Sequence, residues 1–314
     1  MSVNQSTIGK AIAIILVVFG HLGFVPNGGA LGVSIFLVLS GYGLVKSAER
    51  DDYKLKGYWR KRFVSVYLPF LVCSFFTVCL LWLIKYPMIN NNYKCYSTIL
   101  GMIGFPNNPY DPTMWYISYI FMMYLSFWCS FKFFKIKRNR VFICTVYCLI
   151  VGIGSIFVYT DSIGVYLYLF SFPIGVIVAS YDGIMILLCR MINSCKIGVL
   201  MLIIIALEYM SYRNIIFYIL LTVCVSLFVI PILMRLRQVK KKLIFIIGKS
   251  SFAIYLIEGI MMKIMWEYIG KDKGFWNFLC GLIIVNVGIV IHYIWKLLFG
   301  HMKMTLRSDP VPRK

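Results

Sequence analysis

The chain has 314 residues, of which 61% are hydrophobic and only 14% are charged, and its formal net charge at pH 7 is +21. So few polar residues cannot cover a water-soluble globule of this length, which excludes a soluble enzyme or binding module. The apolar runs are continuous and about 20 residues long, whereas the strands of a membrane β-barrel would alternate over about ten residues. The composition therefore predicts an all-α polytopic membrane protein.

Ten apolar runs follow one another along the chain and predict a bundle of ten transmembrane helices. Residues 183–188 belong either to the end of the sixth run or to a short amphipathic segment. The longest outward connection, residues 87–113, is either an acceptor-facing loop or a plain connector. We expect one integral membrane domain over residues 1–314 and no separate soluble domain. The runs centre on residues 8–25, 31–47, 65–86, 114–134, 141–159, 162–181, 196–211, 214–235, 243–266 and 274–299.

The distribution of basic residues predicts the orientation of these helices. Lys and Arg cluster after every even-numbered run, whereas the other connections carry only scattered bases. Because positively charged loops are retained in the cytoplasm, this alternation places both termini there. Topology and contact with anionic headgroups also account for the net charge, so the expected partners are membrane lipids and not nucleic acids. The clusters lie at residues 46–62, 132–140, 190–196, 235–242 and 303–314.

The cysteines and the acidic residues indicate little about function. Nearly all ten cysteines lie inside apolar runs, without the spacing of a zinc or haem site, so we expect them to pack as small hydrophobic residues and predict no metal. Glu208 and Glu258 fall inside apolar runs, where a carboxylate needs a partner or a proton. Glu208 lies near the outer end of its run, where water or Arg213 would satisfy it.

His21 is a candidate functional residue, because ionisable groups at membrane depth are energetically costly and usually functional. Lys10 lies eleven residues earlier, and helical geometry places the pair about 16 Å apart on nearly the same face. We expect Lys10 at the cytoplasmic edge and His21 deeper in the membrane. Lys10 either meets a phosphate or snorkels to the headgroups. His21 is a general base, an acyl carrier, or only a hydrogen-bonding group within the bundle.

Several segments share an order and spacing with one known family. The first two runs contain Lys10, then ten residues, then His21, and continue with Gly32-Val-Ser-Ile-Phe-Leu-Val-Leu-Ser40-Gly41-Tyr42-Gly43. Further matches are Tyr58-Trp-Arg60-Lys61-Arg62, Tyr67-Leu-Pro69, Met114-Trp115-Tyr116-Ile117-Ser118 and Ser250-Ser-Phe-Ala-Ile-Tyr255-Leu256-Ile257. In these segments the chain resembles the acyltransferase 3 family of polytopic membrane acyltransferases, which O-acylate cell-surface glycans in bacteria.

The chain departs from the family pattern at three positions. Lys10 stands where the family usually has arginine, which keeps the charge but loses the bidentate fork that binds phosphate. The acidic residue often found shortly after the tryptophan is replaced by apolar neighbours of Ser118. Glu258 stands where a histidine commonly follows Tyr-Leu-Ile.

The resemblance implies that acyl-coenzyme A, with acetyl-coenzyme A expected, is the cytoplasmic donor and that a sugar hydroxyl at the outer face is the acceptor. His21 would then be catalytic, and Glu258 would either orient it or bind an acceptor hydroxyl. The expected cofactor contacts are Lys10, Ser40, Tyr42, Arg60, Lys61 and Arg62, and the expected acceptor contacts are Trp115, Tyr116, Ser118 and Asp111. Each group also has an alternative explanation without a ligand. The bases at 60–62 could only set topology, Ser40 could only serve helix packing, residues 115–118 could form an interfacial aromatic belt, and Asp111 could be a solvated loop acid.

The predicted function is therefore membrane O-acylation of a surface polysaccharide or lipid-linked sugar, in the bacterial cytoplasmic membrane. Two other functions are compatible with a many-span protein that contains buried carboxylates. One is a non-enzymatic transporter or exporter of lipid-linked sugars, although the chain shows neither an internal repeat nor paired Gly/Pro-broken spans. The other is a scaffold subunit of an envelope machine, which would tolerate replacement of every ionisable membrane residue.

Overall fold

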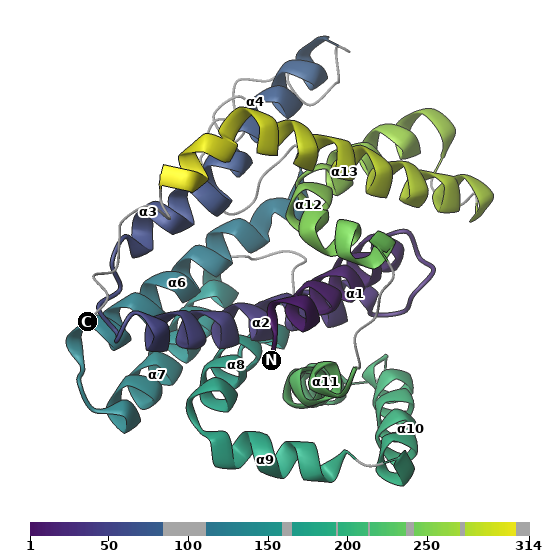
Figure 1. The fold of residues 1–314 in the computed structure, drawn as a ribbon. Helices are drawn as coiled ribbons and strands as arrows, with labels where there is room; N and C mark the ends of the chain where they lie inside the picture. Colours follow the sequence, from purple (N-terminus) through teal and green to yellow (C-terminus); the bar gives the residue numbers. More distant parts are fainter. Residues whose placement is uncertain are drawn as a thin grey trace. The chain divides into compact units, whose positions relative to one another are not determined.

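The computed structural model describes residues 1–83, 111–158, 165–192, 194–212, 214–236, 242–270 and 274–305. These residues form helices and no strand, which confirms the predicted all-α class (Figure 1). Seven of their helices are long and apolar enough to cross a membrane, or eight if one bent pair crosses as a unit. The protein is therefore a multi-pass membrane protein. The count of ten spans and the cytoplasmic placement of both termini stay predictions.

The chain divides into two compact units, residues 1–55 with 119–249, and residues 56–118 with 250–314. Of the predicted loop at residues 87–113, only the last three residues lie in the described part. The first unit contains α1 (Val3–His21), α2 (Gly28–Arg50), most of α6 (Trp115–Phe133), α7 (Lys137–Val158), η4 (Val165–Tyr168), α8 (Ser171–Ser180), α9 (Asp182–Met191), α10 (Ser194–Ser211), α11 (Ile215–Arg235) and the start of α12 (Lys242–Ile269). The second contains α3 (Tyr58–Arg62), η1 (Phe63–Tyr67), α4 (Leu68–Leu83), η3 (Pro112–Met114), the first turn of α6, the rest of α12 and α13 (Gly274–Thr305).

Glycines let α2 pack closely against α1 and α8 in the first unit (Figure 1). A Cβ added to Gly32 would lie 2.4 Å from the carbonyl oxygen of Ala13 in α1. A Cβ on Gly41 would lie 2.5 Å from the carbonyl oxygen of Phe172 in α8. Both positions belong to the family-like segment in α2, and small residues are the usual means by which membrane helices approach each other. Gly41 therefore has a packing role.

Two buried hydroxyl groups connect α11 to the segment that contains η4 and α8. Thr222 donates to the carbonyl oxygen of Leu167 at 2.7 Å, and Ser226 donates to the Ser171 hydroxyl at 2.9 Å. Such bonds stabilise helix pairs where no water is available. After Ser180 the chain bends by 106° into α9. Residues 183–188 thus lie in α9, a helix separate from α8.

The second unit begins with a helix whose hydrogen-bond pattern changes midway. The π-helix η1 separates α3 from α4, and the Leu68 amide donates to the Phe63 carbonyl, five residues back. Pro69 explains the change, because it has no amide hydrogen to bond to the carbonyl four residues earlier. Farther along this unit, a Cβ on Gly288 of α13 would lie 2.6 Å from the Cα of Ile254. α12 and α13 therefore pack backbone to backbone at this glycine.

Candidate active site

α1 places His21 at its last position. The helix begins earlier than the apolar run suggests because Ser2 and Gln5 form a capping box: Ser2 Oγ accepts from the Gln5 amide at 3.2 Å, and Gln5 Oε1 accepts from the Ser2 amide at 2.8 Å. It ends where the chain turns at Gly23, whose φ is +84°. The helix therefore begins and ends nearer the N-terminus than the expected run of residues 8–25. His21 lies at the end of the helix and not deep within it.

The imidazole of His21 lies beside the first turn of α2. A Cβ on Gly29 would be 3.0 Å from His21 Nε2, and a Cβ on Gly20 would be 2.5 Å from the Gly29 amide nitrogen. The His21 side chain is exposed, as is that of Lys10. Because α1 is one continuous helix across both residues, their spacing keeps them on nearly the same face, as predicted.

Asn27 joins the start of α2 to α10. It is the residue before α2, has a left-handed backbone with φ +48°, and does not cap the helix with its side chain. Its amide instead donates to Glu208 Oε1 and to the Ser211 hydroxyl, both at 2.9 Å. Among the described residues, Glu208 thus has a partner in an asparagine from the α1–α2 connection, whereas the expected partner Arg213 lies outside them. Sequence reasoning missed this contact, since nothing local links two residues so far apart in the chain.

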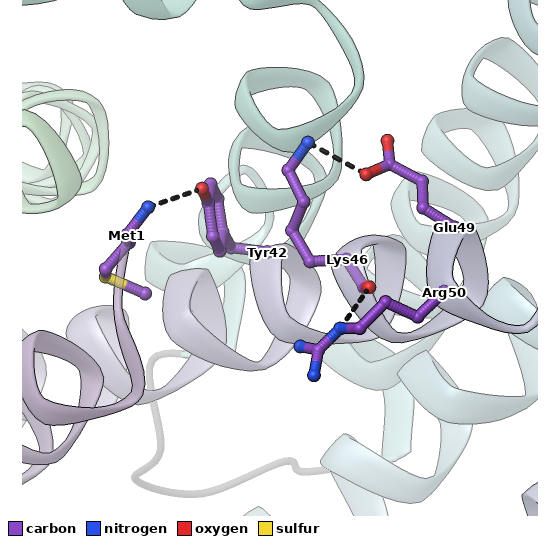
Figure 2. A network of polar contacts seen from close by, with 5 residues as sticks. All are labelled: Met1, Tyr42, Lys46, Glu49 and Arg50. Atoms are coloured by element: carbon purple, nitrogen blue, oxygen red, sulfur yellow. Dashed lines mark hydrogen bonds and ion pairs between the residues drawn. The ribbon is translucent and has the colours of Figure 1, made fainter.

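The other two expected cofactor contacts of the first unit lie farther along α2. Tyr42 is buried, and its hydroxyl accepts from the Met1 ammonium at 3.1 Å (Figure 2). One turn on, Lys46 donates to Glu49 Oε2 at 2.9 Å. Ser40 is half-buried. A cofactor contact by Ser40 or Tyr42 stays a prediction.

The basic segment Arg60, Lys61 and Arg62 forms most of α3, which begins after Gly57 with φ +59°. Arg60 and Lys61 are exposed, while Arg62 is half-buried with its guanidinium 5.4 Å from the ring centroid of Tyr58. The π-helix follows at once, and such helices occur frequently at functional sites. Exposed cations on a short helix are accessible to a phosphate-bearing ligand, and this role also stays a prediction.

A buried acidic cluster forms the polar centre of the second unit. Asp111 and Glu258 are both fully buried. Asp111 Oδ1 accepts from the Thr113 amide at 2.9 Å and from the Thr113 hydroxyl at 2.6 Å. A Cβ on Gly259 would lie 2.1 Å from the same oxygen, so the carboxyl group packs directly on the α12 backbone. Asp111 is therefore not a solvated loop acid.

Burial raises the pKa of Asp111 to about 6. The hydrogen bonds from Thr113 oppose this rise, the negative charge of Glu258 adds to it, and the positive charge of Lys263 opposes it. A carboxyl group that titrates near neutral pH can exchange a proton with a ligand under physiological conditions.

Aromatic residues surround the η3 end of this cluster. Tyr255 donates to the carbonyl oxygen of Thr113, and its ring meets that of Tyr116 edge to face at 5.5 Å. Trp115 is 9% exposed, whereas Tyr116 and Ser118 are half-buried. The structure thus brings Tyr116 together with Asp111 through Tyr255 and Thr113. An acceptor contact by any of them stays a prediction.

The predicted site residues divide between the two units. Lys10, His21, Ser40 and Tyr42 lie in the first, and the others lie in the second. A contact in which Glu258 orients His21 therefore stays a prediction. Among the described residues, no three His, Cys, Asp or Glu side chains are grouped so that they could hold a metal ion.

Comparison with known proteins identifies the class. The sequence model of an acyltransferase domain matches residues 4–294, nearly the whole chain. The chain therefore belongs to the acyltransferase 3 family, as the resemblance predicted. Together with the helical multi-pass fold, this makes it a membrane acyltransferase. No curated protein and no solved structure matches it significantly.

Proposed function

We propose that this protein moves an acyl group, with acetyl expected, from cytoplasmic acyl-coenzyme A to a sugar hydroxyl at the outer face of the bacterial cytoplasmic membrane. The acceptor is a surface polysaccharide or a lipid-linked sugar. The observation that carries the proposal is the position of His21, exposed at the end of α1 with Nε2 beside the first turn of α2. Under the predicted topology this end of α1 faces outward, where the acceptor is found.

The proposed chemistry uses His21 as a general base. Nε2 takes the proton of the acceptor hydroxyl as its oxygen attacks the thioester carbonyl carbon. The C–S bond then breaks, the imidazolium returns the proton to the thiolate, and free coenzyme A leaves with an O-ester formed. The Gly28 amide donates to the Val25 carbonyl, but the following first-turn amides of α2, those of Gly29 and Ala30, are not capped by the Asn27 side chain. They carry partial positive charge and are suited to stabilise the oxyanion of the tetrahedral intermediate.

The acyl-carrier alternative differs in one step. His21 Nε2 would attack the thioester itself and hold the acyl group as an acyl-imidazole before the sugar hydroxyl takes it. The two routes are distinguishable, because only the carrier leaves label on the protein when the acceptor is absent.

The anionic donor fits the charged residues near the predicted cytoplasmic side. Coenzyme A carries several phosphate groups, and Arg60 and Lys61 are exposed cations. Lys10 lies on the His21 face of α1, between the helix start and the histidine. We propose that the α3 cations hold the nucleotide phosphates and that Lys10 contacts the donor on its way to His21.

The test is acyl transfer by the purified full-length protein in phospholipid vesicles, with radiolabelled acetyl-coenzyme A inside and oligosaccharide or lipid-linked sugar outside. We expect hydroxylamine-sensitive label on the sugar, and its loss in His21→Ala and His21→Gln. His292→Ala, which changes another membrane histidine on α13, is the matched control and should keep activity. Unchanged transfer in the folded His21 variants would overturn the assignment, and transport of unmodified sugar would support the transporter instead.

A further inference from the structure

A cavity of about 310 Å³ lies between α12 and α13. This volume is at the lower end of the range for small-molecule sites, about 300–1,000 Å³. The cavity lies among the last turns of α12 and the first turns of α13. Its lining includes Met261, Met265, Tyr268, Trp276, Cys280 and Ile283.

The lining determines which ligand chemistry is suitable. It has no charged side chain, and its polar groups are limited to a tyrosine hydroxyl, an indole and a thiol. A sugar, a phosphate or coenzyme A would leave polar groups without hydrogen bonds here, which is costly. A hydrocarbon chain needs no such partners. The flexible side chains of Met261 and Met265 can adapt to its shape.

The position of the cavity indicates the source of that chain. Both helices qualify as membrane spans by length and composition. The surrounding side chains are apolar yet exposed, at 68% for Tyr268, 71% for Phe275 and 44% for Ile283. The cavity is thus continuous with a surface of the kind that spanning helices present to lipid, and the bilayer phospholipids are the hydrocarbon at that surface.

We propose that this cavity binds one acyl chain of a membrane phospholipid. The chain enters from the bilayer and fills the space between α12 and α13. α12 also contains Glu258 and Gly259, against which Asp111 packs. The bound lipid therefore stabilises the helix on which the acidic cluster of the second unit is built. Binding of this lipid requires neither the acyl donor nor the acceptor.

The experiment is photolabelling of the full-length protein in phosphatidylethanolamine and phosphatidylglycerol vesicles that contain a trace of phospholipid with a diazirine in one acyl chain. We expect adducts to concentrate on the peptides that line the cavity. Cys280→Phe fills the cavity and should reduce this labelling by at least about tenfold, which corresponds to about 1.4 kcal/mol of binding free energy. Cys73→Phe, a cysteine change on α4 outside the lining, should leave the labelling intact.

Thermal unfolding of each variant in detergent separates loss of the site from loss of the fold, and Ile283→Phe is a second filling variant if Cys280→Phe does not fold. Cavity labelling no stronger than that of exposed positions on α7 would overturn the proposal, and so would labelling that a folded filling variant leaves unchanged. Labelling by a photoreactive polyprenyl phosphate alone, or crosslinking of the cavity to a second copy of the chain, would also overturn it.

Discussion

The imidazole of His21 occupies the space that a side chain on Gly29 would take. A Cβ at position 29 would come 3.0 Å from Nε2 and 3.3 Å from Cδ2 of the ring. Such distances are tighter than ordinary van der Waals contact, so the ring would have to shift. The orientation of the proposed catalytic nitrogen therefore depends on the absence of a side chain on the neighbouring helix.

We expect Gly29→Ala to lower kcat for acyl transfer by at least about tenfold, which corresponds to about 1.4 kcal/mol of activation free energy. The reason is misplacement of Nε2, since a small displacement of a reacting group is sufficient to slow a reaction strongly. Gly43→Ala is the matched control, because this glycine of the same helix has open space around its Cβ position. Full activity in Gly29→Ala would show that the ring orientation seen here is not the catalytic one.

Asp111 predicts a pH dependence of stability. Its pKa in the folded protein is about 6, raised by burial from 3.8. The folded state therefore holds this proton more tightly than the unfolded chain, so stability is greatest below the lower value and decreases as the pH rises toward the higher one. The shift of about two units corresponds to about 3 kcal/mol at 1.36 kcal/mol per unit.

The measurement is thermal unfolding in detergent between about pH 4 and about pH 7, a range that covers the rise in the pKa of Asp111 on folding. Asp111→Asn keeps an oxygen that can accept the Thr113 hydrogen bonds but does not titrate, so we expect a flatter profile and a stability above wild type at neutral pH. Asp52→Asn changes an exposed acid and should follow the wild-type profile. Parallel profiles for Asp111→Asn and wild type would contradict the assignment.

The sequence predicted the fold class because continuous apolar runs of membrane length leave no other structure for the backbone. The ends of the helices were harder to predict. The apolar pattern suggested that the first helix continues past His21, but the capping box at Ser2 and the turn at Gly23 shift it toward the N-terminus. The serine–glutamine spacing was visible in the sequence and would have given the correct start.

The contacts between distant segments of the site could not be predicted from the sequence. The helical spacing was sufficient to place Lys10 and His21 on one face, since that relation is local. The contacts of Asp111 with Gly259 and of Asn27 with Glu208 join segments far apart in the chain. Only tertiary packing decides such pairs, and a single sequence contains no local signal for them. The sequence offered two readings of Asp111, an acceptor contact or a solvated loop acid, and did not predict its burial, which follows from the same packing.

Gly259→Ala should disrupt the acidic cluster. The added Cβ would come 2.1 Å from Asp111 Oδ1, which neither the α12 backbone nor the hydrogen-bonded carboxyl group can accommodate without moving. We expect a loss of about 1–3 kcal/mol in the free energy of unfolding, the usual cost of overpacking. Gly154→Ala is the control, because nothing lies within 4 Å of its Cβ position. Equal melting temperatures in the two variants would contradict the close packing of Asp111 on α12.

Removal of the α3 cations should change the affinity for the acyl donor without changing the rate of the chemical step. Arg60→Gln and Lys61→Gln remove charges remote from His21 in the chain, and we expect KM for acyl-coenzyme A to rise about tenfold with kcat nearly constant, since such contacts bind ground state and transition state alike. The KM of wild type should also rise with salt, and less steeply in the variants, because screening weakens exposed charge pairs. Lys54→Gln, an exposed lysine before α3, is the matched control. If all three variants keep the wild-type KM, the cluster serves topology alone and the donor phosphates bind elsewhere.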